Sequence, residues 1–239
     1  MTRGVQKIGV AAALAVAALA PAAHAAAPKV DLLVAFRDGS AKQARVTASA
    51  TTAKLGARRC AVGQGTPLAA LLRARIGPIK LKDYGSCSRR PADAAGLYVR
   101  SIRADRARGS DGWVYKVGTK TASAGAADPS GPFGRGRLRR DAIVTWFYCH
   151  MNASTGSCQR TLLSEAQDLG GGMLGVTVRA FDDRGRARPA AGATVHAGDV
   201  TGTTGDDGVA RFAVPPGKAF VYAELKGAVR SFGRTVASK

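Results

Sequence analysis

The four cysteines of this 239-residue chain constrain its fold more than any other feature. They are Cys60, Cys87, Cys149 and Cys158, and all of them lie in the first two thirds of the sequence. An even number of cysteines indicates disulfides in an exported protein, whereas in a cytoplasmic protein it more often indicates metal binding or catalysis. The compartment therefore decides how this part of the chain can be stabilised.

The N-terminus has the pattern of a removable secretory signal. Two basic residues precede an almost purely apolar run (residues 8–20), and Ala23 and Ala25 are small residues at the positions that a signal peptidase inspects. The run has about 13 residues, whereas a helix that spans a bilayer needs roughly 20. A membrane anchor is the rival interpretation. The pattern predicts a signal peptide over residues 1–25 and a mature chain that is secreted, outside the cytoplasm, with no membrane span.

Export makes disulfides the leading interpretation of the cysteines. Four cysteines allow three pairings, and sequence order favours Cys60–Cys87 and Cys149–Cys158. The second pair closes a short loop with little chain to order, and each bridge adds about 3 kcal/mol by constraining the unfolded chain. A metal site that contains His150 with its two neighbouring cysteines is the alternative, although the spacing matches no compact zinc motif.

Positive charge dominates the composition. The chain has 36 Lys and Arg residues against 16 Asp and Glu residues, a net charge of +20, which favours an acidic partner over a basic one. Residues 26–170 carry 24 basic and 10 acidic residues, and residues 171–239 carry 10 and 6. This asymmetry suggests two units with different surfaces. We expect domains with these limits, joined flexibly at the three glycines of residues 170–172.

The first unit is expected to fold as one helix against a mixed sheet. Thr66 is placed as the N-cap of the helix and Gly77 as its end. Residues 121–136 are rich in Ala, Gly, Ser and Pro and predict a connecting loop. Four short runs rich in β-branched and aromatic residues predict strands: residues 30–36, 97–102, 113–117 and 143–148.

The aromatic strands also carry a resemblance to a known family. Gly112-Trp113-Val114-Tyr115-Lys116-Val117, the Gly/Ala-rich loop and the run from Ile143 to Tyr148 resemble the transcobalamin-like C-terminal domain family over about residues 29–148. The resemblance implies a small β-grasp-like fold. It also implies an alternative function as a carrier of a small, corrinoid-like ligand, although the sequence shows no sign of the helical barrel that holds the corrinoid in vertebrate carriers. Four aromatic residues would contact such a ligand, and their alternation along the strands equally fits a core face: Trp113, Tyr115, Trp146 and Tyr148.

The second unit has short strands and turns at regular spacing. Apolar residues alternate from residue 174 to residue 179, and turn signals recur at residues 182–185, 206–208 and 215–217. The order of these segments resembles the carboxypeptidase-regulatory or prealbumin-like Ig-type β-sandwich modules of secreted bacterial proteins, over about residues 173–235. Such modules stabilise, space or present another domain. The predicted fold class is an α+β β-grasp-like domain with one main helix, followed by an all-β Ig-like, prealbumin-like sandwich.

A basic cluster follows the predicted loop of the first unit. Guanidinium groups bind phosphate or carboxylate groups through paired hydrogen bonds, so the cluster can bind polyanions such as anionic cell-envelope polymers. A solvated loop edge in an Arg-rich chain is the alternative. Nucleic acid is not favoured, because that partner requires aromatic residues on the same exposed face. The candidate contacts are Arg135, Arg137, Arg139 and Arg140.

No residue pattern indicates catalysis. The sequence lacks a Gly-x-Ser-x-Gly elbow and a His-Glu-x-x-His motif. Cys149 beside His150 is the best candidate nucleophile, and a disulfide would remove it. Acidic residues in the turns of the second unit are better explained by turn formation than by calcium binding. We expect no cofactor, no metal and no enzyme activity.

The leading functional hypothesis follows from these absences. It is a secreted, non-enzymatic protein of the cell envelope or exterior, in which the first domain binds a ligand or another secreted protein and the second is structural. An enzyme of unrecognised chemistry is the remaining alternative.

Overall fold

The computed structural model describes residues 26–85 and 87–239, and the predicted signal peptide lies outside them. Of the described residues, 48% lie in strands and 6% in helices. The helices are α1 (Pro67–Arg73) and a 3-10 helix, η1 (Pro91–Gly96). Within this part of the chain, neither helix has the length and hydrophobicity that crossing a bilayer requires.

The strands fall into two groups along the chain. The first unit contains β1 (Lys29–Ala35), β2 (Ala41–Thr47), β3 (Thr51–Leu55), β4 (Arg58–Val62), β5 (Ile79–Asp83), β6 (Leu97–Ile102), β7 (Asp105–Arg106), β8 (Gly112–Val117), β9 (Lys120–Thr121) and β10 (Ile143–Cys149). The second contains β11 (Thr161–Gly170), β12 (Met173–Phe181), β13 (Ala187–Pro189), β14 (Thr194–Ala197), β15 (Val200–Thr203), β16 (Val209–Ala213), β17 (Gly217–Glu224) and β18 (Arg234–Ser238). The four predicted strands are present as β1, β6, β8 and β10, each within one residue of its predicted limits.

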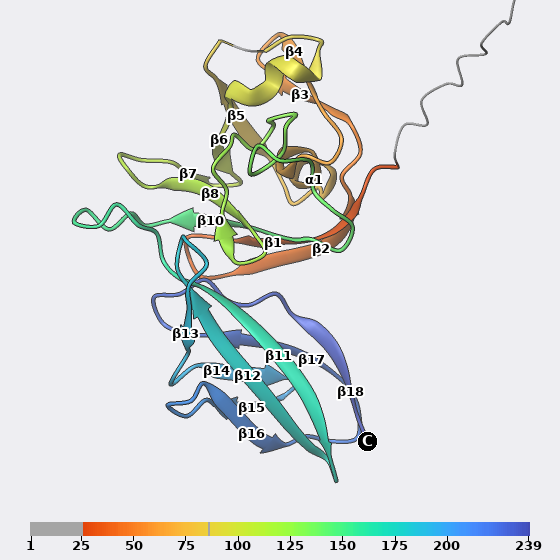
Figure 1. Cartoon of the computed structure of the whole chain (residues 1–239), viewed down its shortest axis with the longest axis vertical. Coiled ribbons are helices and arrows are strands. Elements are labelled where there is room, and N and C mark those ends of the chain that lie inside the picture. The colour runs from red at the N-terminus through yellow and green to blue at the C-terminus, as the bar shows by residue number, and fades with distance from the viewer. Residues whose placement is uncertain (1–25, 86) are drawn as a thin grey trace, which may run out of the picture.

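The central sheet of the first unit is mixed. Its strand order is β2-β1-β10-β8-β9, with β1 parallel to β10 and the other neighbours antiparallel. Successive side chains in a strand point to opposite faces. One face carries the main core of the unit and is covered by α1 together with two small sheets, β3-β4 and β5-β6-β7 (Figure 1).

The prediction of an α+β domain with one main helix is wrong. The helix is capped as expected, since Thr66 Oγ1 accepts a hydrogen bond from the N–H of Ala69 at 3.2 Å, but it ends at Arg73 after seven residues. Arg75 adopts a left-handed φ of 51°, so the helix stops before Gly77. Most of the area that a long helix would cover is covered by β-structure, and the protein as a whole is mostly β.

The second unit is a sandwich of two antiparallel sheets. One sheet contains β11, β12, β13 and β16, and the other has the order β15-β14-β17-β18. Apolar residues of both sheets, such as Val176, Val195 and Val221, are buried between them. This architecture is compatible with the all-β sandwich that the alternation of residues 174–179 predicts.

The glycines of residues 170–172 are not a flexible junction between the units. β11 pairs with β12 along its length, so these glycines form the turn of a hairpin inside the second unit. All three have positive φ, the region that favours glycine. The chain passes between the units from Cys149 to Thr161, and the second unit begins about ten residues earlier than predicted.

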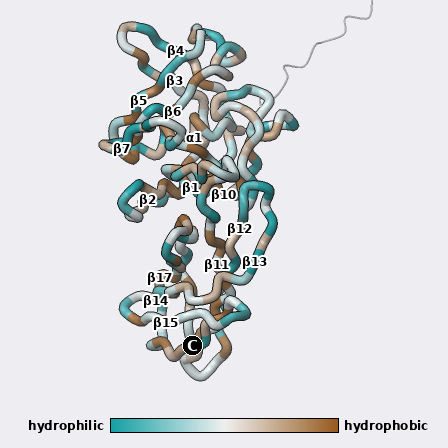
Figure 2. Tube along the Cα trace, turned by 90° about the vertical axis from the view of Figure 1, so that its left-hand side faces the viewer, coloured by the Kyte–Doolittle hydropathy of each residue, from teal (hydrophilic) through white to brown (hydrophobic). Residues whose placement is uncertain are grey.

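The second unit packs against the other face of the central sheet. Ala35, Phe147, Cys149 and Val229 form a small buried cluster there. The side-chain amide of Gln43 donates to the carbonyl oxygen of Gly233 and accepts from its N–H, both at 2.9 Å. Figure 2 shows the units stacked along the long axis of the molecule. The central sheet is therefore covered on both faces.

Both predicted disulfides are present. Cys60–Cys87 spans 27 residues of sequence, and Cys149–Cys158 spans 9 residues within the segment that connects the units. The described part of the chain contains no free cysteine. The bridge between Cys149 and Cys158 excludes both the metal site and the thiol nucleophile that the sequence left open.

Candidate anion-binding groove

The predicted arginine cluster lies where the long loop of the first unit leads into β10. Leu138 anchors this segment, because its side chain is buried and its N–H donates to the carbonyl oxygen of Gly65 at 2.8 Å. Gly65 has a φ of 69°, and a Cβ at this position would lie 2.9 Å from Cβ of Arg137. This close approach requires glycine. The arginines beside Leu138 therefore extend into solvent from a well-anchored backbone.

Three of the four predicted arginines line one hollow, which we call the arginine groove. Its volume is about 390 Å³, and no Asp or Glu is among the described residues that line it. Its cationic residues are Lys120, Arg135, Arg137 and Arg139, and its apolar residues are Val117, Pro132, Phe133, Leu138 and Ala142. Arg140 is exposed and lies outside the lining. The groove combines an apolar floor with a cationic rim.

The charges of the groove are not neutralised by the protein. None of the four predicted arginines forms an ion pair with a described carboxylate. The acid nearest in sequence, Asp141, pairs with Arg45 instead. Like charges that share one hollow repel each other, and a bound anion relieves this repulsion. The arrangement is therefore suited to holding an anion.

The four aromatic residues considered as ligand contacts belong to the core. Trp113, Tyr115, Trp146 and Tyr148 are all less than a tenth exposed. The hydroxyls of Tyr115 and Tyr148 donate to backbone carbonyls at 2.7 and 3.1 Å, and burial raises the pKa of Tyr115. Three of the four border a hollow of about 210 Å³. Pockets for drug-sized ligands measure roughly 300–1,000 Å³, so this hollow is too small to enclose a corrinoid.

The acidic turn residues contact protein groups rather than converging on a metal site. Asp182 accepts hydrogen bonds from the N–H groups of Arg184 and Arg186 and from Nε of Arg186, the last at 2.7 Å. The backbone hydrogen bond from Arg186 is the main cause that lowers the pKa of Asp182 to about 2. Among the residues that the structure describes, no group of three or more His, Cys, Asp or Glu side chains could hold a metal ion.

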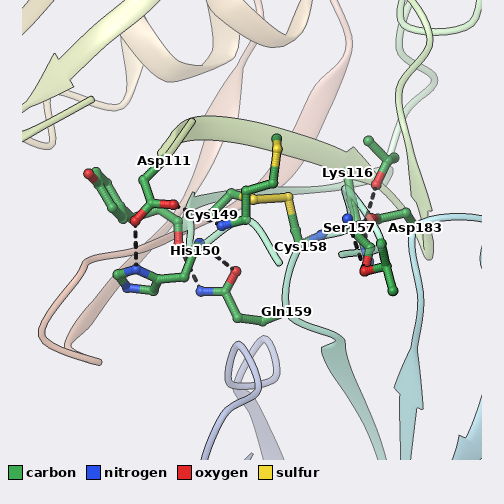
Figure 3. The surroundings of a disulfide bond; sticks show 12 residues. Asp111, Lys116, Cys149, His150, Ser157, Cys158, Gln159 and Asp183 are labelled. Carbon is green, nitrogen blue, oxygen red and sulfur yellow. Dashed lines mark hydrogen bonds and ion pairs between the residues drawn. A yellow bond between two sulfur atoms is a disulfide. The ribbon is translucent and has the colours of Figure 1, made fainter. Parts of the chain in front are cut away.

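The sequence patterns missed a buried cation between the units. Lys116 in β8 is fully buried, and its Nζ donates to the carbonyl oxygens of Phe181 at 3.1 Å and Asp182 at 3.0 Å. Nζ also lies 3.5 Å from Oδ1 of Asp183. Burial is the main cause that lowers the pKa of Lys116. Figure 3 shows Lys116 and Asp183 beside the Cys149–Cys158 disulfide.

Comparison with known proteins adds no name to this geometry. No family model matches the sequence, and no curated protein or solved structure matches it. The resemblances to the transcobalamin-like and prealbumin-like families stay predictions from sequence motifs.

Proposed function

We propose that this chain is an exported, non-enzymatic protein that binds anionic polymers of the cell envelope through the arginine groove. The observation that carries the proposal is the convergence of Lys120 and three arginines on one hollow whose described lining has no carboxylate. Two formed disulfides support export, because such bridges persist in oxidising compartments.

A polymer suits the groove because its cations follow one another along the chain. Arg135, Arg137 and Arg139 alternate with Gly136 and Leu138, and the buried Leu138 leaves its neighbours exposed. Repeating anionic groups can engage several guanidinium groups at once, which raises the affinity above that of a single contact. In this proposal the second unit is structural, since it covers the far face of the central sheet.

The test compares retention on purified anionic cell-wall material and on inorganic polyphosphate at increasing salt. The variant R135Q/R137Q/R139Q removes three charges from the groove. If each lost contact lowers the slope of log affinity against log salt by about 0.7, as for single-stranded polyanions, the slope falls by about 2. Retention by the natural sequence should decrease steeply with salt.

A matched control separates the groove from overall charge. The variant R179Q/R188Q/R211Q removes three exposed arginines of the second unit and the same net charge. It should keep the salt dependence of the natural sequence. Equal losses in both variants, or retention that salt does not affect, would reject the groove as the binding site. The corrinoid-carrier alternative predicts a shift in the visible spectrum of added corrinoids, and we expect none.

A further inference from the structure

A separate pair of hollows lies between the two units, and we call it the inter-unit cleft. The outer hollow measures about 750 Å³ and the inner one about 230 Å³. Gly39 of the first unit and Gly227, Ala228 and Arg230 of the second border both hollows, so the two adjoin each other. Sites for small molecules occur preferentially at interfaces between domains.

The inner hollow brings together basic residues from three distant parts of the sequence. Arg37 follows β1, His150 follows β10, and Arg230 lies between β17 and β18. No Asp or Glu is among the described residues that line this hollow. Nδ1 of His150 lies 3.2 Å from Oδ2 of Asp111 (Figure 3). Neither arginine forms an ion pair with any carboxylate that the structure describes.

Arg230 is held in place before any ligand binds. Its guanidinium carbon lies 3.8 Å from the centroid of the Tyr222 ring. This contact restricts the guanidinium group, so less freedom is lost when it binds an anion. Nε of Arg230 is buried and has no hydrogen-bond partner in the described part of the chain.

The remaining lining of the inner hollow includes apolar side chains beside Gln159 and glycine backbone. Phe36, Tyr148 and Val229 border it with the small part of each side chain that is exposed, less than a tenth, and Cζ of Arg37 lies 5.8 Å from the centroid of the Tyr148 ring. A volume of about 230 Å³ accommodates one ring rather than a long chain, since pockets for larger, drug-sized ligands begin at roughly 300 Å³. The hollow therefore matches a small molecule with a flat apolar body and one negative group.

The outer hollow disfavours ligands that reach into it with more than one negative charge. It is lined by Asp38 and Glu224 as well as by Lys226. A polyanion that extended from the inner hollow into the outer one would meet these two carboxylates and be repelled by them. The cleft and the arginine groove therefore favour different anions.

We propose that the inner hollow of the inter-unit cleft binds small aromatic monocarboxylates, with Arg230 and Arg37 holding the carboxylate. Arg230 provides the fixed guanidinium group, and Arg37 provides a second cation from the opposite unit. The apolar walls receive the ring. This inference does not depend on polymer binding by the groove.

The test uses the full oxidised chain after signal removal, with benzoate as the probe and benzamide as its neutral counterpart of the same shape. Calorimetric titration should give saturable 1:1 binding of benzoate in the millimolar range, the scale expected for so few atoms. Benzamide should bind at least tenfold more weakly. R230Q should abolish this preference, and R37Q, which changes an exposed side chain, should reduce it several-fold. The matched control R137Q changes the groove only and should keep the preference.

Three results would overturn the inference. One is equal affinity for benzoate and benzamide in the natural sequence. Another is the absence of saturation by benzoate up to tens of millimolar. The third is an equal loss of benzoate binding in R137Q and R230Q, which would place the probe outside the cleft. If R230Q does not fold, unchanged benzoate binding by R37Q serves as the contradicting result. None of these results affects the salt-dependent retention that tests the groove.

Discussion

Replacement of Asp183 by alanine is expected to destabilise the protein because it leaves the Lys116 ammonium group buried without a nearby countercharge. The Lys116 side chain is 0% exposed and that of Asp183 is 28% exposed. Removal of one partner from a buried ion pair costs about 3–5 kcal/mol. Because Asp183 retains some contact with solvent, the lower end of this range applies to the ion pair.

The same substitution removes two further hydrogen bonds. One oxygen of Asp183 accepts from the hydroxyl of Thr121 and the other from the N–H of Cys158, both at 3.0 Å. Each such bond contributes about 1 kcal/mol or somewhat less where solvent can replace the acceptor. We therefore expect D183A to lower the free energy of unfolding by about 4 kcal/mol.

A second background isolates the part that comes from the buried charge. In K116M the ammonium group is replaced by an apolar chain of similar length, so D183A should then cost only about 1–2 kcal/mol, the value of its neutral hydrogen bonds. Equilibrium unfolding in urea measures the free energy of unfolding of the natural sequence, of D183A, of K116M and of the double variant. Trp113 and Trp146, the two tryptophans of the sequence, report on the core of the first unit by fluorescence. Equal costs of D183A in both backgrounds would refute the account of Lys116 as a charge that depends on Asp183.

Three further outcomes follow from single contacts. Replacing Cys149 and Cys158 together by alanine should lower the free energy of unfolding by about 2.7 kcal/mol, from the chain entropy of a loop of roughly ten residues; urea unfolding of the oxidised proteins checks this, and an unchanged midpoint would contradict it. T66A removes the cap of α1 and should cost about 1–2 kcal/mol by the same assay, with T66S as the control that keeps the hydroxyl. Asp182 has a pKa of about 2 against an ordinary value of 3.8, so its contribution is present above pH 4 and is lost as the pH falls towards 2. The variant D182N should lack this part of the acid destabilisation. Acid unfolding curves that are identical for D182N and the natural sequence would contradict the prediction.

Elements with a local signal in the sequence were predicted well. The aromatic and β-branched runs of β8 and β10 form strands of the buried central sheet, and their limits were correct within one residue. Thr66 was identified because a cap depends on a few adjacent residues. The strands β2 and β5 were missed because their apolar residues are few and alternate with lysine or arginine. Their pairing depends on distant partners, which a local pattern does not contain.

The contact between the units also depends on distant partners that a local sequence pattern does not contain. Lys116 alternates with Trp113 and Tyr115, so the pattern places it on the opposite face of its strand but does not show what covers that face. Phe147 was a weak signal that this face is also covered, because it points to the same side and is fully buried. What covers the face comes from residues 161–239, and the hairpin glycines before β12 were mistaken for a linker.

The two candidate sites differ for a related reason. The arginine groove was visible in the sequence because three of its cations lie within five residues of each other, from Arg135 to Arg139. The inter-unit cleft was not, because Arg37 and His150 are brought together by the pairing of β1 with β10, and Arg230 joins them only through packing of the units. Residues brought together in this way are far apart in the sequence, so no motif with a fixed spacing can describe the site.

Packing of the units also determines how far each site depends on Asp183. Arg135, Arg137 and Arg139 of the groove lie in the loop before β10, whereas Lys120 adjoins Thr121, a partner of Asp183. Loosening the contact between units therefore leaves the three arginines in place. The inter-unit cleft has walls from both units, and Arg230 comes from the second. We therefore expect D183A, at temperatures where it remains folded, to retain anionic polymer as the natural sequence does but to bind benzoate several-fold more weakly. Retention and calorimetry on the same preparation measure both. A parallel loss of the two activities would mean that the sites are not structurally independent, because the change at Asp183 would then reach the groove through Thr121 and its neighbour Lys120.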